Sequence, residues 1–213
     1  MPKTGPFEGH VKQYEQWFEK NNLVYKSELE AVRLLLPEGA RGVEIGAGTG
    51  RFSSPLGIRI GIEPSRAMAN LARKRGINLI FGVAENLPLK NDSCDFALMV
   101  TTICFVDELE QSFREAWRIV KPGGFLIVGF VDRESPLGKT YEKNKQKSVF
   151  YRNATFYSMD EVVSCMKNLG FENLEFTQTI FHKPGETREL EPVQKGYGEG
   201  SFVVVRGQKG KSG

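Results

Sequence analysis

Apolar positions along the chain follow two different spacings, which predict alternating helices and strands. Helical spacing places Phe7, Val11, Tyr14 and Phe18 on one face of a segment over residues 7–20, and it recurs over 27–36, where Ser27 is the expected N-cap. It recurs again over 66–75, 109–120 and 158–169. Short apolar runs typical of buried strands occupy 43–45, 58–62, 78–81, 96–100, 125–128, 174–180 and 202–205. This alternation indicates an α/β domain.

Composition narrows the class of protein. The chain has 213 residues, of which 40% are hydrophobic, enough for one α/β domain with additions. The net charge of +3, from 29 basic and 26 acidic residues, provides no large field, so we expect neither a nucleic-acid nor a membrane partner. Cys94, Cys104 and Cys165 are far apart and odd in number, so we expect neither a disulfide framework nor a metal site, and a cytoplasmic location.

The most informative stretch is a glycine-rich segment over residues 41–65. The strand ending in Glu44 and Ile45 leads into Gly46, Gly48 and Gly50, and a second strand ends at Glu63. Glycine tolerates positive φ and has no Cβ, so the backbone amides of such a loop can approach a ligand closely. A carboxylate at the end of the second strand can accept hydrogen bonds from both hydroxyls of a ribose, so the unit indicates a site for an adenosine-bearing ligand.

The spacing of the glycines distinguishes between such ligands. Hydride cofactors are bound by Gly-x-Gly-x-x-Gly, whereas this chain has Gly-x-Gly-x-Gly with Glu44 two residues before the first glycine. An acid there repels a pyrophosphate and suits a positively charged amine. The alternative without a ligand is a tight strand-to-helix turn with a surface glutamate.

Together with Glu63, this stretch resembles the first two motifs of the class I S-adenosylmethionine-dependent methyltransferases, and the Lys-Pro-Gly-Gly segment at 121–124 also matches that family closely. The resemblance implies a Rossmann-like, mixed seven-stranded sheet with helices on both faces and an antiparallel last strand between the fifth and sixth strands. It also implies S-adenosyl-L-methionine as cofactor. The cofactor-binding residues expected from it are Glu44, Gly46, Ala47, Gly48, Gly50, Glu63, Pro64, Ala84, Glu85, Leu87 and Thr101.

The segment over 82–95 resembles the part of the family's fold that lies against the adenine, with one departure. Val83 replaces the acid that usually accepts a hydrogen bond from the adenine amine. We expect Ala84 to offer its backbone amide, Glu85 to supply the polar contact and Leu87 to pack on the ring.

Two further segments concern the methyl acceptor. Tyr14 and Trp17 belong either to an aromatic lid or to an ordinary helix that covers the sheet, and Thr101 and Thr102 are either site residues or strand-end caps. Residues 132–157 form an insertion with a local excess of positive charge, typical of a solvated helical face. In related enzymes the insertion covers the acceptor pocket, so the candidate acceptor-lining residues are Tyr14, Trp17, Thr102, Tyr151 and Tyr157.

We therefore expect a helical lid region over 1–36, a methyltransferase domain over 37–207 with a lid insertion at 132–157, and a disordered tail over 208–213. The expected reaction is methyl transfer from S-adenosylmethionine to an N, O or S atom of a small-molecule acceptor. A non-catalytic, S-adenosylmethionine-binding regulatory protein and a nicotinamide dehydrogenase are the alternatives. No residue is assigned as a catalytic base, because His10 and His182 both lie outside the recognised motifs.

Overall fold

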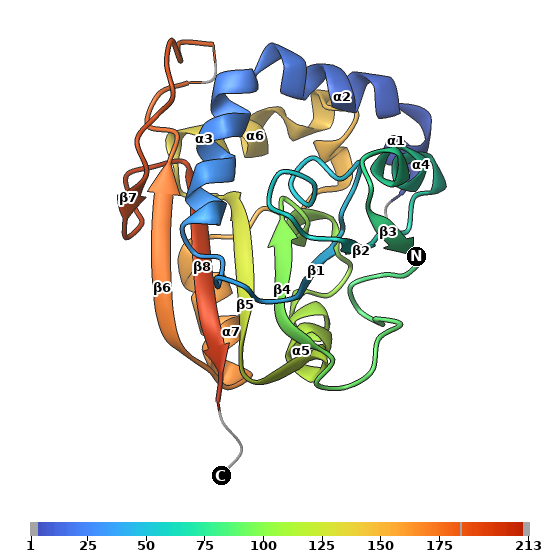
Figure 1. Cartoon of the computed structure of the whole chain (residues 1–213). Coiled ribbons are helices and arrows are strands. Elements are labelled where there is room, and N and C mark those ends of the chain that lie inside the picture. The colour runs from blue at the N-terminus through green and yellow to red at the C-terminus, as the bar shows by residue number, and fades with distance from the viewer. Residues whose placement is uncertain (1–3, 184, 211–213) are drawn as a thin grey trace.

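A mixed sheet of eight strands forms the centre of the molecule in the computed structural model, which describes residues 4–183 and 185–210 (Figure 1). The strand order is β3-β2-β1-β4-β5-β8-β6-β7. The strands are β1 (Gly42–Ile45), β2 (Ile60–Ile62), β3 (Asn78–Ile80), β4 (Cys94–Val100), β5 (Val120–Val131), β6 (Phe171–Thr179), β7 (Gln194–Lys195) and β8 (Phe202–Lys209). The first five are mutually parallel, and β8 runs antiparallel between β5 and β6, as predicted.

Helices cover both faces of this sheet, which confirms the predicted Rossmann-like arrangement. They are α1 (Gly5–Gly9), α2 (Val11–Lys20), α3 (Asn22–Arg33), α4 (Arg66–Lys74), α5 (Leu109–Ile119), α6 (Pro136–Asn144) and α7 (Met159–Asn168), with short 3-10 turns at Ile103–Phe105, Lys145–Lys147 and Tyr151–Asn153. In Figure 1, α3 crosses in front of the sheet, α5 and α7 lie on its far side, and α2 passes over the upper edge.

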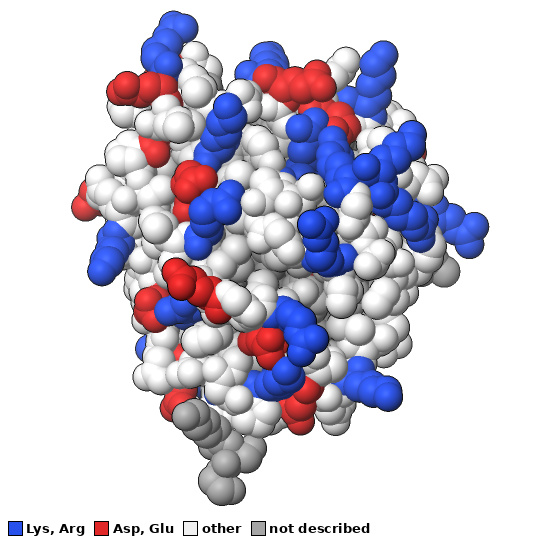
Figure 2. Space-filling view, viewed as in Figure 1, with Lys and Arg blue, Asp and Glu red and all other residues white. Residues whose placement is uncertain are grey.

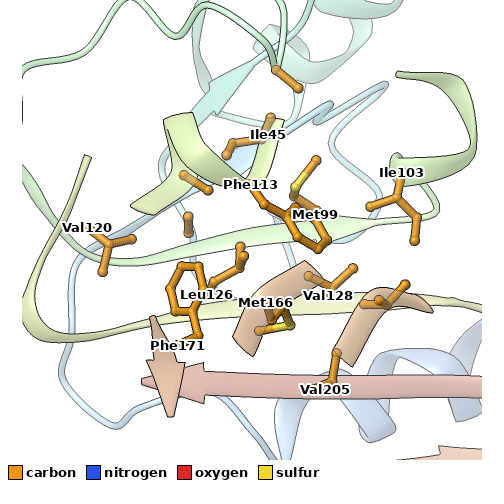
Figure 3. Close-up of a cluster of buried hydrophobic side chains, with 14 of the residues drawn as sticks. Ile45, Met99, Ile103, Phe113, Val120, Leu126, Val128, Met166, Phe171 and Val205 are labelled. Carbon is orange, nitrogen blue, oxygen red and sulfur yellow. The ribbon is translucent and has the colours of Figure 1, made fainter. Parts of the chain in front are cut away.

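Side chains of β4 alternate between two hydrophobic cores, because successive residues of a strand point to opposite faces. Ala97 and Met99 join the core beneath α5 and α7, which also holds Phe113 and Met166 (Figure 3). Phe96, Leu98 and Val100 face the other core, beneath α2 and α3. The central strands are therefore buried on both sides, which accounts for their nearly continuous apolar sequence.

The structure corrects four details of these expectations. The sheet has eight strands rather than seven, because the two-residue β7 adds to the edge of β6. The segment over 7–20 forms two helices that are separated at His10, where φ is −128°. Helix α3 begins at Asn22, so Ser27 lies inside it rather than at its N-cap, and its hydroxyl donates to the Leu23 carbonyl. Residues 208 and 209, expected in the tail, belong to β8, which continues through Lys209; residues 211–213 lie outside the described residues.

Three further local features concern α5, the segment after the glycines and the start of β5. Trp117 in α5 is 38% exposed, with the ammonium of Lys209 3.8 Å from the centre of its ring. Residues 51–57 form turns. The Lys-Pro-Gly-Gly segment is at the beginning of β5, where the pairing with β4 shifts register. A Cβ on Gly124 would lie 2.4 Å from the Asp95 carbonyl oxygen, so this close approach requires glycine.

Charges of both signs are spread over the face shown in Figure 2, with lysine and arginine most concentrated near α1, α2 and α4. Among the described residues, no helix is both long and apolar enough to cross a membrane.

Removing a large side chain from the core beneath α5 provides a test of this packing. Phe113 is fully buried, so we expect Phe113→Ala to lower the free energy of unfolding by about 3–5 kcal/mol, measured by urea denaturation. Phe81 is 47% exposed, and Phe81→Ala should cost no more than about 1 kcal/mol. Equal losses in the two variants would contradict the assigned core.

Candidate functional site

The glycine loop that follows β1 adopts a backbone that other residues rarely adopt. Gly46, Gly48 and Gly50 have φ values of 72°, 54° and 79°. The Gly46 and Ala47 amides donate to the Ile62 carbonyl at 2.8 and 3.0 Å, which holds the loop against the end of β2. A Cβ on Gly46 would lie 2.4 Å from the Thr102 side chain, so the loop and the segment after β4 can meet only if this residue is glycine.

Glu63 fixes the other side of the loop. Its carboxylate accepts hydrogen bonds from the Gly48 amide and from the Ser65 amide, each at 2.8 Å. Only 6% of the residue is exposed. Burial raises the pKa of Glu63, and these two amides offset part of that rise because they favour the charged form. One carboxylate thus connects the loop to the start of α4.

A cavity of about 110 Å³ lies between the loop, Glu63 and the ends of β3 and β4. Nine of the residues predicted as site residues line it, namely Tyr14, Gly46, Gly48, Glu63, Pro64, Ala84, Glu85, Thr101 and Thr102. The remaining wall residues are Thr4, Phe7, Met68, Gly82, Val83, Val100, Phe105 and Val106. Seven predicted residues do not line it: Glu44, Ala47, Gly50, Leu87, Trp17, Tyr151 and Tyr157.

Glu44 lies behind the loop. It is 2% exposed, its carboxylate accepts a hydrogen bond from the Ser53 hydroxyl, and burial raises its pKa to about 8. Ala47 and Leu87 are buried, and the Leu87 amide donates to Glu115 at 2.7 Å. The φ of 79° explains Gly50, and a Cβ there would also lie only 3.1 Å from the Ile77 side chain.

Glu85 lines the cavity, but its carboxylate also stabilises the start of α5. It accepts hydrogen bonds from the amides of Asp107 and Glu108, at 2.6 and 3.4 Å, at the start of α5. A contact between this carboxylate and an adenine amine stays a prediction. Val83, the departure from the family pattern, is a neighbouring wall residue.

Helices α1 and α2 form the roof of the cavity. Phe7 and Tyr14 line it from above, and their rings lie 6.2 Å apart in an edge-on arrangement. The Tyr14 hydroxyl approaches Gly48, since a Cβ there would lie 3.3 Å from it. Burial, and to a lesser extent the nearby Glu44 and Glu63, raises the pKa of the Tyr14 phenol. Trp17 lies one turn further along α2, against the ring of Phe18.

An ionic cluster attaches this roof to the glycine loop. The Glu15 carboxylate pairs with Arg51 and Arg75 and accepts a hydrogen bond from the Thr49 hydroxyl. Arg75 also donates to the Thr49 carbonyl at 2.7 Å. Burial alone would raise the pKa of Glu15, but these hydrogen bonds outweigh it and lower the pKa. A second attachment comes from Glu8 in α1, which accepts the Arg66 amide at the start of α4 at 2.6 Å.

A second, smaller cavity of about 20 Å³ adjoins the first at Thr101, which lines both. Thr101 has a φ of 50°, a strained value for a β-branched residue. We name this second space the aromatic chamber; its walls are Thr101, Ile103, Cys104, Phe130, Val131, Tyr141, Tyr151, Phe156 and Tyr157. The predicted acceptor residues Tyr151 and Tyr157 therefore lie together here, apart from Tyr14 and Thr102.

Sequence reasoning missed part of the site. Thr4 and Met68 come from elements distant in sequence, and nothing in their local pattern indicates a ligand. Phe105 lies in the segment after β4 that also contains the predicted site residues Thr101 and Thr102, so its position in the sequence could have indicated it. Three positive residues of the 132–157 insertion, Arg133, Lys139 and Lys145, form ion pairs, such as Arg133 with Glu161 at 3.0 Å, in agreement with the solvated-face interpretation.

A parallel sheet with a glycine loop and a buried acid at the carboxyl ends of adjacent strands defines an α/β protein that binds a nucleoside-bearing ligand. A family model described as a methyltransferase domain matches residues 43–128. A crystal structure from Thermotoga maritima, described as a SAM-dependent methyltransferase and possible histamine N-methyltransferase, is 60% identical with a TM-score of 0.95, and the match covers 97% of this chain and 99% of that one.

Two sequence relatives complete the comparison. The uncharacterized protein MJ1123 of Methanocaldococcus jannaschii is 45% identical over 95% of this chain and 98% of its own length. The ubiquinone/menaquinone biosynthesis C-methyltransferase UbiE of Campylobacter jejuni is 30% identical over 57% of this chain and 61% of its own. This chain belongs to the SAM-dependent methyltransferases, enzymes whose methyl donor is S-adenosylmethionine.

The ionic cluster on the roof can be tested by removing its central charge. Glu15→Gln leaves Arg51 and Arg75 without their carboxylate, so we expect the free energy of unfolding to fall by about 1–3 kcal/mol and α1 and α2 to be cleaved faster in limited proteolysis. Glu19→Gln changes an exposed residue of the same helix and should alter neither measurement. Unchanged proteolysis of Glu15→Gln would contradict the attachment.

The buried Glu44 predicts a pH dependence of stability. A folded-state pKa of about 8, above the ordinary value of 4.5, means that folding favours the protonated form, so its stabilising contribution is lost as pH rises from about 5 to 8. Urea denaturation across this range should show a smaller decline for Glu44→Gln than for the wild type, by on the order of a few kcal/mol. The exposed Glu38→Gln should follow the wild type, and identical profiles for all three proteins would contradict the shift.

Proposed function

We propose that this enzyme transfers a methyl group from S-adenosylmethionine, held beside the glycine loop, to a nitrogen, oxygen or sulfur atom of a small-molecule acceptor held in and around the aromatic chamber. The observation that carries the proposal is that Thr101 lines both cavities. Donor and acceptor placed on its two sides would meet there, under a roof formed by this chain itself. A roofed site supports a small acceptor rather than a surface of a macromolecule.

The residues of the larger cavity fit the donor. Gly46 and Gly48 present backbone without side chains, and a Cβ at either position would meet Thr102 or Tyr14. Glu63 lies where it can accept hydrogen bonds from the ribose hydroxyls, because each carboxylate oxygen now bonded to one amide keeps a second lone pair. Ala84 offers its backbone to the adenine. Glu44 lies behind the loop, and the positive amino group of a bound donor would favour its charged form.

The bound donor supplies an electrophilic methyl group on a sulfonium. The remaining task of the chain is to hold an acceptor lone pair in line with that methyl and to exclude water. The roof residues Phe7 and Tyr14 and the aromatic chamber provide the enclosure. An acceptor that arrives with a free lone pair requires no general base, which agrees with the lack of any histidine among the lining residues of the two cavities.

Nitrogen is the acceptor atom that the comparisons favour. The Thermotoga maritima relative, which is described as a possible histamine N-methyltransferase, is similar over nearly the whole chain, whereas the C-methyltransferase UbiE is similar over little more than half. Membership of an enzyme family favours catalysis over a non-catalytic regulatory role. We also propose a cytoplasmic location, supported by three cysteines that form no disulfide with one another.

The ribose contact of Glu63 can be tested by calorimetry with S-adenosylhomocysteine. We expect Glu63→Ala to weaken binding by on the order of 1–3 kcal/mol, because the ribose hydroxyls would lose their acceptor in a dry site. Because Glu63 also holds the loop, the free energy of unfolding is measured in parallel, and Glu38→Gln serves as the control. Unchanged affinity in folded Glu63→Ala would exclude Glu63 as the ribose ligand.

The acceptor can be sought with a methyl-labelled donor. Purified enzyme incubated with a small-molecule extract and labelled S-adenosylmethionine should transfer label to a compound that passes an ultrafiltration membrane and separates from the donor by chromatography. Label that remains only with macromolecules, or that is not transferred at all, would refute a small-molecule acceptor.

A further inference from the structure

Glu28 is a buried acid without a role in the fold. It lies in α3 on the same face as Val24, Ala31, Val32 and Leu35, all of which are buried, and only 5% of it is exposed. Burial raises its pKa to about 8, and no other cause contributes to the shift. Among residues 4–183 and 185–210, none donates a hydrogen bond to its carboxylate or forms an ion pair with it.

The other buried acids of the described chain all have donors. Glu44 accepts from Ser53, Glu63 from two backbone amides, Asp132 from the Glu134 amide, and Glu191 from the amides of Phe181 and His182. An unpaired carboxylate in an apolar setting is costly whether it is charged or must take up a proton. A neutral glutamine or a leucine would suit α3 better. No interaction within the described chain offsets the free-energy cost of burying Glu28, which indicates a binding partner from outside the chain.

The aromatic chamber lies close to Glu28. Tyr141, which lines the chamber, also packs against the hydrophobic core that contains Val24 and Val32, residues on the same face of α3 as Glu28. The charge of Glu28 contributes to the raised pKa of the Tyr141 and Tyr151 phenols, after the larger effect of burial. The ring centres of Tyr141 and Tyr151 lie 5.1 Å apart, and that of Phe156 lies 6.1 and 5.5 Å from them. Phe105 stacks on Tyr151 at 5.9 Å, which connects the chamber to the wall of the donor cavity.

Aromatic faces beside a buried carboxylate are a combination that recognises an organic cation, because both the ring faces and the carboxylate carry negative potential. The same surroundings repel an anion and give a neutral group no charge to pair with. The chamber volume of about 20 Å³ has room for a group about the size of one water molecule, such as an ammonium.

We propose that the methyl acceptor is a small organic amine whose ammonium group enters the aromatic chamber and pairs with Glu28, while another atom of the same molecule lies at Thr101 and accepts the methyl group. Glu28 is then the residue that determines acceptor specificity. This inference rests on the proposed function, because it describes the acceptor half of that site.

The experiment extends the labelled-donor assay by separating the products according to charge. The unreacted donor, itself a cation, is first separated by chromatography. The remaining small-molecule products are passed over a cation-exchange resin at pH 7, and label is expected in the retained, cationic fraction. Glu28→Gln keeps the shape of the side chain and removes its charge. We expect it to lower labelling at least about tenfold at limiting extract, with recovery as the extract is concentrated, as expected for a loss of acceptor binding.

Two controls separate this role from a structural one. Affinity for S-adenosylhomocysteine should stay within about twofold in Glu28→Gln, whose thermal stability at pH 8 should equal or exceed that of the wild type, because a costly buried carboxylate is removed. Glu30→Gln alters an exposed acid of the same helix and should leave labelling unchanged. Glu28→Asp keeps the charge and serves as a second variant; it should retain more transfer than Glu28→Gln.

The outcomes distinguish the inference from the proposed function. Label in the unretained fraction, or labelling unchanged by Glu28→Gln, would overturn the amine acceptor and leave methyl transfer to a small molecule intact. Absence of label from every small molecule would overturn the proposed function and the inference together. Charge fractionation of the wild-type products tests the amine acceptor even if a variant fails to fold.

Discussion

The bonds from the Gly48 and Ser65 amides to the buried Glu63 carboxylate are the interaction on which the site depends. They hold a loop of positive-φ residues at the carboxyl ends of β1 and β2. Without Glu63, these two backbone amides would lie beside the cavity with no hydrogen-bond acceptor. The same carboxylate organises the loop and faces the cavity, so under the proposed function ligand binding and local folding depend on one residue.

The roof formed by α1 and α2 is attached by charged side chains, whereas the glycine loop below it is held by hydrogen bonds from its backbone amides. Glu15 connects α2 to Arg51 beside the loop and to Arg75 at the end of α4, while Glu8 connects α1 to the start of the same helix. The ion pairs of Glu15 are only partly exposed to water, so they are stronger than ordinary surface pairs, whereas the Glu8 contact is exposed. Phe18 of α2 adds a hydrophobic attachment, because it is buried in the core beneath this helix.

Burial of acids follows a pattern across the molecule. Glu63 lines the larger cavity, Glu44 lies behind the glycine loop, and both accept hydrogen bonds, whereas Glu28 near the aromatic chamber accepts none from the described residues. Stability at neutral pH is lower for each of these raised pKa values, because folding favours protons that the unfolded chain releases. Sites that recognise cations commonly carry such a cost, since a carboxylate must be kept dry to act strongly.

The amino-acid sequence by itself determined the fold class, the glycine loop, the acid at the end of β2 and the antiparallel β8, because these follow from local spacing and from residues with few conformational alternatives. It could not determine that Trp117 is exposed, that Lys209 belongs to a strand, or that Ser27 lies inside α3. Those depend on which elements pack together. Only the tertiary structure placed Thr4, Met68 and Phe105 around one cavity and Glu28 beside Tyr141 and Tyr151, because contacts between residues so far apart in the chain leave no periodic signal in it.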